Sequence, residues 1–289
     1  DISREVCVLS AVLVALLLTG LEAASLKGAD NLFVPIGTCL MLERITTKPA
    51  VEVLYQNISL LMLCGLIALM VSRNKALNTG GTIVFLLFLY SAWSLGSEAW
   101  ALPIFASFIV YLLSWKWLVS AERTGQTIRV RLATRALGVP FAILMASSIM
   151  RSYNYFYAPF LASLAVVLAL TLWSQIASRK TTSRKSLSTA LLIGGVSWGA
   201  VVVPCWLIQS STSAALLFSQ LAILLLAAAL NYLFRRTSPT CAENTLSPST
   251  WDVWCVCITA AASLTILFLQ LYGLESWSPP VTSGAVLLK

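Results

Sequence analysis

Long apolar runs separated by short polar loops dominate the chain, and this pattern predicts a bundle of transmembrane helices. A helix needs about 20 apolar residues to cross a bilayer, and lipid offers no partner to a free backbone group, so such runs fold as helices. The predicted runs are Val6 to Ala24, Val53 to Val71, Thr82 to Leu95, Ala99 to Val119, Ala136 to Met150, Phe156 to Ala177, Leu187 to Gln209, Ser213 to Phe234 and Val253 to Leu271. We therefore expect an all-α, polytopic transmembrane bundle of about eight or nine spans.

The same pattern divides the chain into five predicted segments. Residues 1–52 hold the N-terminal span and an interfacial or re-entrant piece, Asn31 to Leu42, which is too short to span and contains Pro35 and Gly37. The segments that follow are a transmembrane core over 53–236, a Ser-, Thr- and Pro-rich polar loop over 237–252, a last transmembrane helix over 253–275 and an irregular tail over 276–289.

Basic residues collect in alternate loops, which is the distribution that the positive-inside rule describes. The rule places the N-terminus and the basic loops in cytoplasm, stroma or matrix, and the C-terminus on the opposite side. Membrane insertion alone explains this pattern, and anionic lipid headgroups are the contacts that it favours. The predicted headgroup contacts are Arg129, Arg131, Arg135, Arg179, Lys180, Arg184 and Lys185.

Composition agrees with a membrane protein and excludes most catalytic chemistry. The chain is 58% hydrophobic and 10% charged, with a mean hydropathy of +0.86, whereas soluble proteins carry roughly 25% charge. It has no His and only 11 Asp and Glu residues, so it offers no Ser-His-Asp triad and no His-containing metal site. The net charge of +8 lies in short clusters between apolar runs, so we expect no nucleic-acid binding.

The seven Cys residues include no CxxC pair, and we interpret them as reduced, buried side chains without a metal. The chain starts at Asp1 without Met, which would fit an imported organelle protein whose targeting segment has been removed, or a trimmed chain.

Ionisable residues are scarce inside the predicted spans, where a transporter would need them. Glu22 and Glu98 lie near helix ends, where water can reach them. Amide and hydroxyl side chains remain, and interhelical hydrogen bonds account for these. Phosphoryl transfer needs carboxylates for a divalent cation, but Glu122, Glu243 and Asp252 are each isolated in sequence.

From Leu77 to about Thr245 the order of features resembles the polytopic isoprenoid-phosphate kinases, whose best-known branch is the plastid phytyl-phosphate kinase of the vitamin E pathway. The stretches that carry the resemblance are Leu77 to Gly81, Glu98 to Leu102, Phe105 to Phe108, Leu170 to Ile176, Gly194 to Ser197 and Leu233 to Cys241. Gly194-Gly195-Val196-Ser197 matches the family's Gly-Gly-Val-Ser, and Leu170 to Ile176 lies where the family reads Asp-Thr-Trp-Ala-Ser-Glu-Ile.

The acidic positions of that family are filled here by residues that cannot ionise. Its Asp and Glu correspond to Leu170 and Gln175, and the Asp of a later helix falls near Leu226. A magnesium nucleotide would then lack ligands, and deleting such charge costs several orders of magnitude in rate. The resemblance thus implies a vestigial site, made of Leu170, Thr171, Ser174, Gln175, Gly194, Gly195, Ser197 and Leu226.

These observations lead to one preferred function and two alternatives. The preferred one is a non-catalytic accessory subunit of a larger membrane complex, with other membrane subunits and anionic lipids as partners and no cofactor beyond bound lipids or pigments. The first alternative is a prenyl-lipid kinase or transferase that uses Glu98, Glu122 or Asp252 as metal ligands. The second is a carrier of lipids or small apolar molecules. By analogy with the family, a plastid membrane, thylakoid or envelope, is favoured over the mitochondrial inner membrane.

Overall fold

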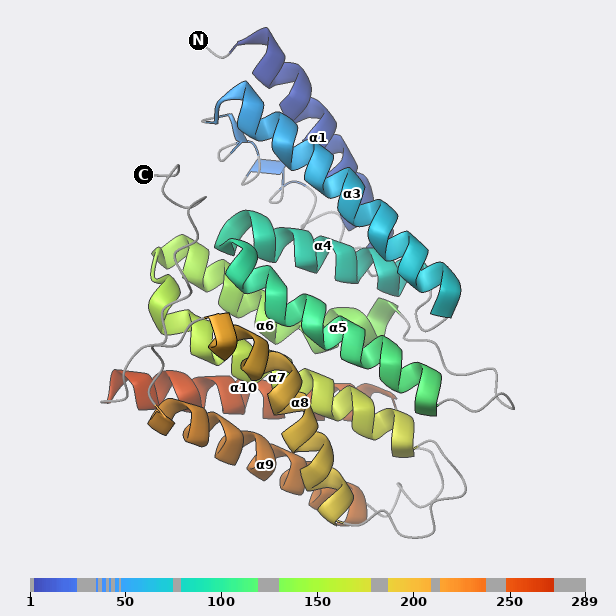
Figure 1. The fold of residues 1–289 in the computed structure, drawn as a ribbon, viewed down its shortest axis with the longest axis vertical. Coiled ribbons are helices and arrows are strands. Elements are labelled where there is room, and N and C mark those ends of the chain that lie inside the picture. The colour runs from blue at the N-terminus through green and yellow to red at the C-terminus, as the bar shows by residue number, and fades with distance from the viewer. Residues whose placement is uncertain are drawn as a thin grey trace. The chain divides into compact units, whose positions relative to one another are not determined.

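A computed structural model describes residues 3–24, 50–74, 79–118, 130–177, 187–208, 214–237 and 248–272, with isolated residues between 35 and 49. All the elements formed by these residues are helices (Figure 1). They are α1 (Arg4–Ala24), α3 (Ala50–Asn74), α4 (Thr79–Gly96), α5 (Glu98–Leu118), α6 (Val130–Met150), α7 (Tyr153–Ala177), α8 (Leu187–Ile208), α9 (Ala214–Thr237) and α10 (Pro248–Leu271).

Each predicted apolar run coincides with one helix, so the all-α prediction is confirmed for the part of the chain that the structure describes. Within the described residues, five helices are long and apolar enough to cross a membrane, and they lie in α3, α7, α8, α9 and α10. The apolar parts of α4, α5 and α6 are shorter. The helices indicate an integral membrane protein, while the full number of spans and their orientation stay predictions.

The last helix begins earlier than its apolar run suggests. It starts at Pro248 and not at Val253, because proline fits the first position of a helix, where its missing N–H would have no partner anyway. The predicted interfacial piece at 31–42 lies outside the described residues except for isolated positions, and the predicted tail at 276–289 lies wholly outside them.

The chain divides into two compact units, the first of which contains α1, α3 and most of α4. Buried side chains of all three helices, among them Leu13, Val53 and Tyr90, form its core. Asn57 of α3 donates from Nδ2 to the carbonyl of Leu9 in α1 at 3.1 Å, and also to the carbonyl of its own Val53 at 2.9 Å. Figure 1 shows α1 and α3 packed along their length.

The second unit, which contains α5, most of α6 and α7 to α10, is organised around α7. In the span of α7, 89% of the residues are buried, whereas the corresponding share in α8, α9 and α10 is 39%, 33% and 33%. Helices α5, α8, α9 and α10 all pack against α7. The core of this unit is therefore one enclosed helix, and the helices around it have broad apolar faces that the described residues do not cover.

Contacts near their N-termini show that α5, α7 and α9 begin at the same end of the second unit. Trp100 of α5 packs edge-on against Tyr153 of α7, with ring centroids 6.1 Å apart. Gln220 of α9 donates from Nε2 to the carbonyl of Ala158 in α7 at 3.2 Å. The turns that precede these helices are those with few basic residues in the sequence.

The opposite end of the second unit joins the C-termini of α7 and α9 to the start of α10. Trp173 packs edge-on against Tyr232 with a centroid distance of 6.4 Å, and Trp254 stacks on Phe234 at 4.3 Å. Helices α7 and α9 are therefore parallel, and α10 is antiparallel to α9. This alternation of helix direction is what the alternation of basic and non-basic loops requires.

A proline in α5 creates a backbone defect that a side chain of α7 repairs. Pro103 has no N–H, so it cannot donate to the carbonyl of Ala99, one turn earlier. The hydroxyl of Tyr157 donates to that same carbonyl at 2.9 Å, and both Tyr157 and Trp100 are fully enclosed. This hydrogen bond satisfies a group that lipid would leave unpaired, and it ties α5 to α7.

We predict that Tyr157→Phe lowers the free energy of unfolding by about 1 kcal/mol, because the Ala99 carbonyl loses its partner. In a Pro103→Ala background the restored N–H of residue 103 can donate to the Ala99 carbonyl. Tyr157→Phe should then lower the free energy of unfolding by less. Thermal unfolding in detergent measures both effects. The half-exposed Tyr155 provides the control, Tyr155→Phe, and an equal cost of Tyr157→Phe in both backgrounds would contradict the repair.

Candidate functional site

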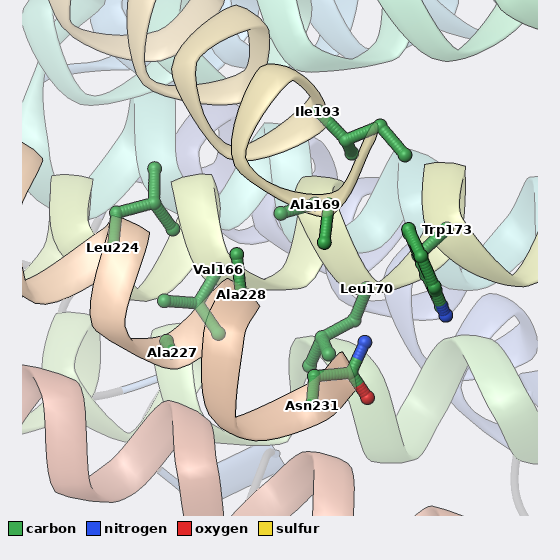
Figure 2. Close-up of a pocket in the computed structure, with 10 residues that line it drawn as sticks. Val166, Ala169, Leu170, Trp173, Ile193, Leu224, Ala227, Ala228 and Asn231 are labelled. Atoms are coloured by element: carbon green, nitrogen blue, oxygen red, sulfur yellow. The ribbon is translucent and has the colours of Figure 1, made fainter. Parts of the chain in front are cut away.

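A small cavity lies between α7, α8 and α9 in the second unit (Figure 2). Its volume is about 10 Å³, which is room for about one water molecule. The residues that line it are Val166, Ala169, Leu170, Trp173, Ala190, Ile193, Leu224, Ala227, Ala228 and Asn231. Most of these side chains are small or aliphatic, so the wall is apolar except at Trp173 and Asn231.

Each wall of the cavity is one face of a helix. The lining residues of α7 and of α9 both follow the spacing i, i+3, i+4, i+7, which places side chains on one side of a helix. On α8, Ala190 and Ile193 continue into Gly194 and Ser197 with the same spacing, and both of these are buried. The cavity is therefore the point where three regular helix faces fail to fill the space completely.

Two of the residues predicted for the vestigial site lie at or beside this cavity. Leu170 lines it directly. Gly194 brings α8 close to α9, since a Cβ built on it would lie 3.3 Å from the Cβ of Ala228 and 3.5 Å from Cδ2 of Leu225. The adjacent Gly195 would meet nothing within 4 Å. The close approach of the two helices thus depends on one glycine of the predicted pair.

Other predicted positions are placed differently. The hydroxyl of Thr171 donates within its own helix, to the carbonyls of Val167 and Leu168. Ser197 is fully buried, and its Oγ has no hydrogen-bond partner. Leu226 is 59% exposed and does not line the cavity. The structure places Leu170 in the lining of the cavity and Gly194 beside Ala228, another lining residue, but it does not place Leu226 there.

The remaining predicted residues cannot be assigned to the site from the structure. Ser174 and Gln175 belong to α7, but their side chains lie outside the described set. Arg131 and Arg135 belong to α6, and their side chains also lie outside the described set. The other predicted headgroup contacts lie outside the described residues, and they are Arg129, Arg179, Lys180, Arg184 and Lys185.

Trp173 and Asn231 supply the polar atoms of the cavity, and sequence reasoning did not place either of them in the site. Both side chains are almost fully enclosed, with 3% and 2% of their surface exposed. The Nε1 of Trp173 and the Oδ1 of Asn231 have no hydrogen-bond partner. Their helical spacing from Leu170 and Leu224 was visible in the sequence, but helices that are apolar on all sides give no reason to prefer one face.

The chemistry of the site is that of hydrogen bonding inside an apolar wall. None of the lining residues ionises, so no side chain there offers an acid, a base or a carboxylate ligand. Among the described residues, no group of three or more His, Cys, Asp and Glu side chains could hold a metal ion. Of the acids considered as unorthodox ligands, Glu98 is exposed at the start of α5, Glu122 lies outside the described residues, and the Asp252 side chain is not described.

Comparison with known protein families, with curated proteins and with solved structures finds no match to this chain.

We predict that Gly194→Val destabilises the protein by about 1–3 kcal/mol, because its branched side chain must force α8 away from Ala228 and Leu225. Gly195→Val is the matched control, with the same chemical change one position along the same helix and open space around it. Thermal unfolding of both variants in detergent measures the difference. Equal losses of stability would contradict the close α8–α9 contact.

Proposed function

We propose that this protein is a non-catalytic, integral membrane subunit of a larger membrane complex, built on a fold derived from isoprenoid-phosphate kinases. The observation that carries the proposal is the character of the cavity between α7, α8 and α9. Leu170 lines that cavity at the position where the resembled kinases have an Asp, and none of the lining residues ionises. A site of this kind supports packing and not phosphoryl transfer.

The size of the cavity supports the same proposal. A volume of about 10 Å³ accepts one water-sized group, whereas a prenyl substrate or a carried lipid needs a chamber many times larger. The kinase and carrier alternatives would both require the second unit to open substantially. A subunit that acts by packing requires no such change.

The free apolar faces of the second unit give this subunit its means of association. Large side chains on α8, α9 and α10 are exposed, among them Leu207, Phe218 and Leu264. In a membrane such faces contact either lipid or another membrane protein, and association there is driven by close packing and interhelical hydrogen bonds. We propose neighbouring membrane subunits as the partners on part of this surface and anionic lipids at the basic loops.

The compartment in this proposal is an organellar membrane, a plastid membrane (thylakoid or envelope) before the mitochondrial inner membrane. Its support is the resemblance to the plastid kinase branch.

Gentle detergent extraction from native membranes, followed by sizing and mass spectrometry, tests the proposed function. We expect the tagged full chain to migrate in an assembly much larger than 31.3 kDa, with stoichiometric partner proteins. A photo-crosslinking residue at exposed Phe218 or Leu264 should capture one of those partners, and the same residue at buried Leu164 should not. A free chain that phosphorylates a prenyl phosphate would overturn the proposal.

The proposed orientation is tested separately by thiol labelling in sealed vesicles. With native Cys residues replaced, Asn154→Cys reports the start of α7, and Thr182→Cys reports the basic loop that follows α7. We expect a membrane-impermeant maleimide to label Thr182→Cys from the side that carries the N-terminus and Asn154→Cys only from the other side. Labelling of both positions from one side would contradict a spanning α7.

A further inference from the structure

The two unpaired polar atoms of the α7–α8–α9 cavity are complementary. The indole Nε1 of Trp173 can only donate a hydrogen bond, and the amide Oδ1 of Asn231 can only accept one. Both side chains line the same cavity and are at least nine-tenths buried. Figure 2 shows the Trp173 indole and the Asn231 amide among the side chains that line the cavity.

Leaving both atoms unpaired would be costly, because a buried polar group without a partner loses its hydrogen bonds to water and gains none in the fold. Water cannot reach such groups freely from a hydrocarbon environment. A single group that accepts from the indole and donates to the amide would satisfy both atoms. A hydroxyl group or a water molecule does both.

The cavity has the volume and the walls that such a group needs. About 10 Å³ matches one water-sized group, and it leaves no room inside the cavity for an apolar chain attached to that group. Its walls are fixed, since Tyr232 packs on the Trp173 ring and the close Gly194–Ala228 contact sets the distance between α8 and α9.

We propose that this cavity is a binding site for a single hydroxyl-sized group, which bridges Nε1 of Trp173 and Oδ1 of Asn231. The group is either a trapped water molecule or the hydroxyl of a lipid alcohol whose chain stays outside the cavity, and both sources share the same hydrogen-bond chemistry. The site is independent of the proposed role in a complex, since it requires no partner protein.

A double-variant experiment in lauryldimethylamine oxide, a detergent without hydroxyl groups, tests the bridge. We expect Asn231→Leu to lower the Tm by about 2–8 °C in the native chain. In a Trp173→Phe background the bridge is already lost, so the same substitution should lower the Tm by less than half as much. Asn57→Leu, which removes a buried amide in the first unit, is the control and should cost the same in both backgrounds. An equal cost of Asn231→Leu in both backgrounds would overturn the proposal.

Adding 1-hexadecanol or hexadecane at equal concentration identifies the source of the hydroxyl. A rise in Tm with the alcohol alone, absent in Asn231→Leu, supports a lipid hydroxyl in the site. If the two additives give the same Tm, and Asn231→Leu still lowers the Tm less in the Trp173→Phe background, the result supports a trapped water molecule.

A second measurement does not depend on the stability of Trp173→Phe. In the folded chain with ¹⁵N-labelled Trp, one of the ten indole N–H signals should shift on Asn231→Leu and show a cross-peak to water or to the added alcohol. A spectrum in which none of the indole signals responds to Asn231→Leu would overturn the bridge.

Discussion

Hydrocarbon offers no hydrogen-bond partner to the backbone, and the described part of this protein is organised by that constraint. Its elements are helices, which satisfy their own N–H and C=O groups. Two of the buried hydroxyls follow the same rule, since Ser163 and Thr259 donate to carbonyls of their own helices, whereas Ser197 Oγ has no partner. Where Pro103 interrupts the pattern in α5, the hydroxyl of Tyr157 supplies the missing donor from α7. One aromatic side chain thus corrects a local defect and joins two helices.

Packing in the second unit follows from the same environment, in which apolar side chains gain little by leaving lipid. Helix α7 is enclosed by its neighbours, and direct contacts hold them together. Gly194 lets the side chain of Ala228 approach α8 closely, and Gln220 donates to the backbone of α7. In the first unit, Asn57 makes the equivalent link from α3 to α1. Small residues and a few buried amides therefore determine which helices pair, although they are a minor part of the composition.

In the cavity between α7, α8 and α9, packing and hydrogen bonding are both incomplete. Three regular helix faces leave a space of about 10 Å³, and two polar atoms without partners, from Trp173 and Asn231, belong to its lining. The lining has no ionisable side chain, so its chemistry is limited to hydrogen bonding within an apolar wall. This combination agrees with the structural role and the small polar site that we propose. Neither property requires the acids that the resembled kinases carry.

Hydropathy along the chain determined the helices, because the need to satisfy the backbone acts locally wherever an apolar run is long enough. It therefore located α1 and α3 to α10 to within a few residues, apart from the earlier starts of α6 at Val130 and of α10 at Pro248. Only the tertiary structure decided which faces meet, because helices that are apolar all round carry no periodic signal to distinguish them. The structure brought Leu170 to the cavity, turned Leu226 away from it, and added Trp173 and Asn231. Those positions depend on how three helices cross, and that crossing is set by contacts between residues far apart in the sequence.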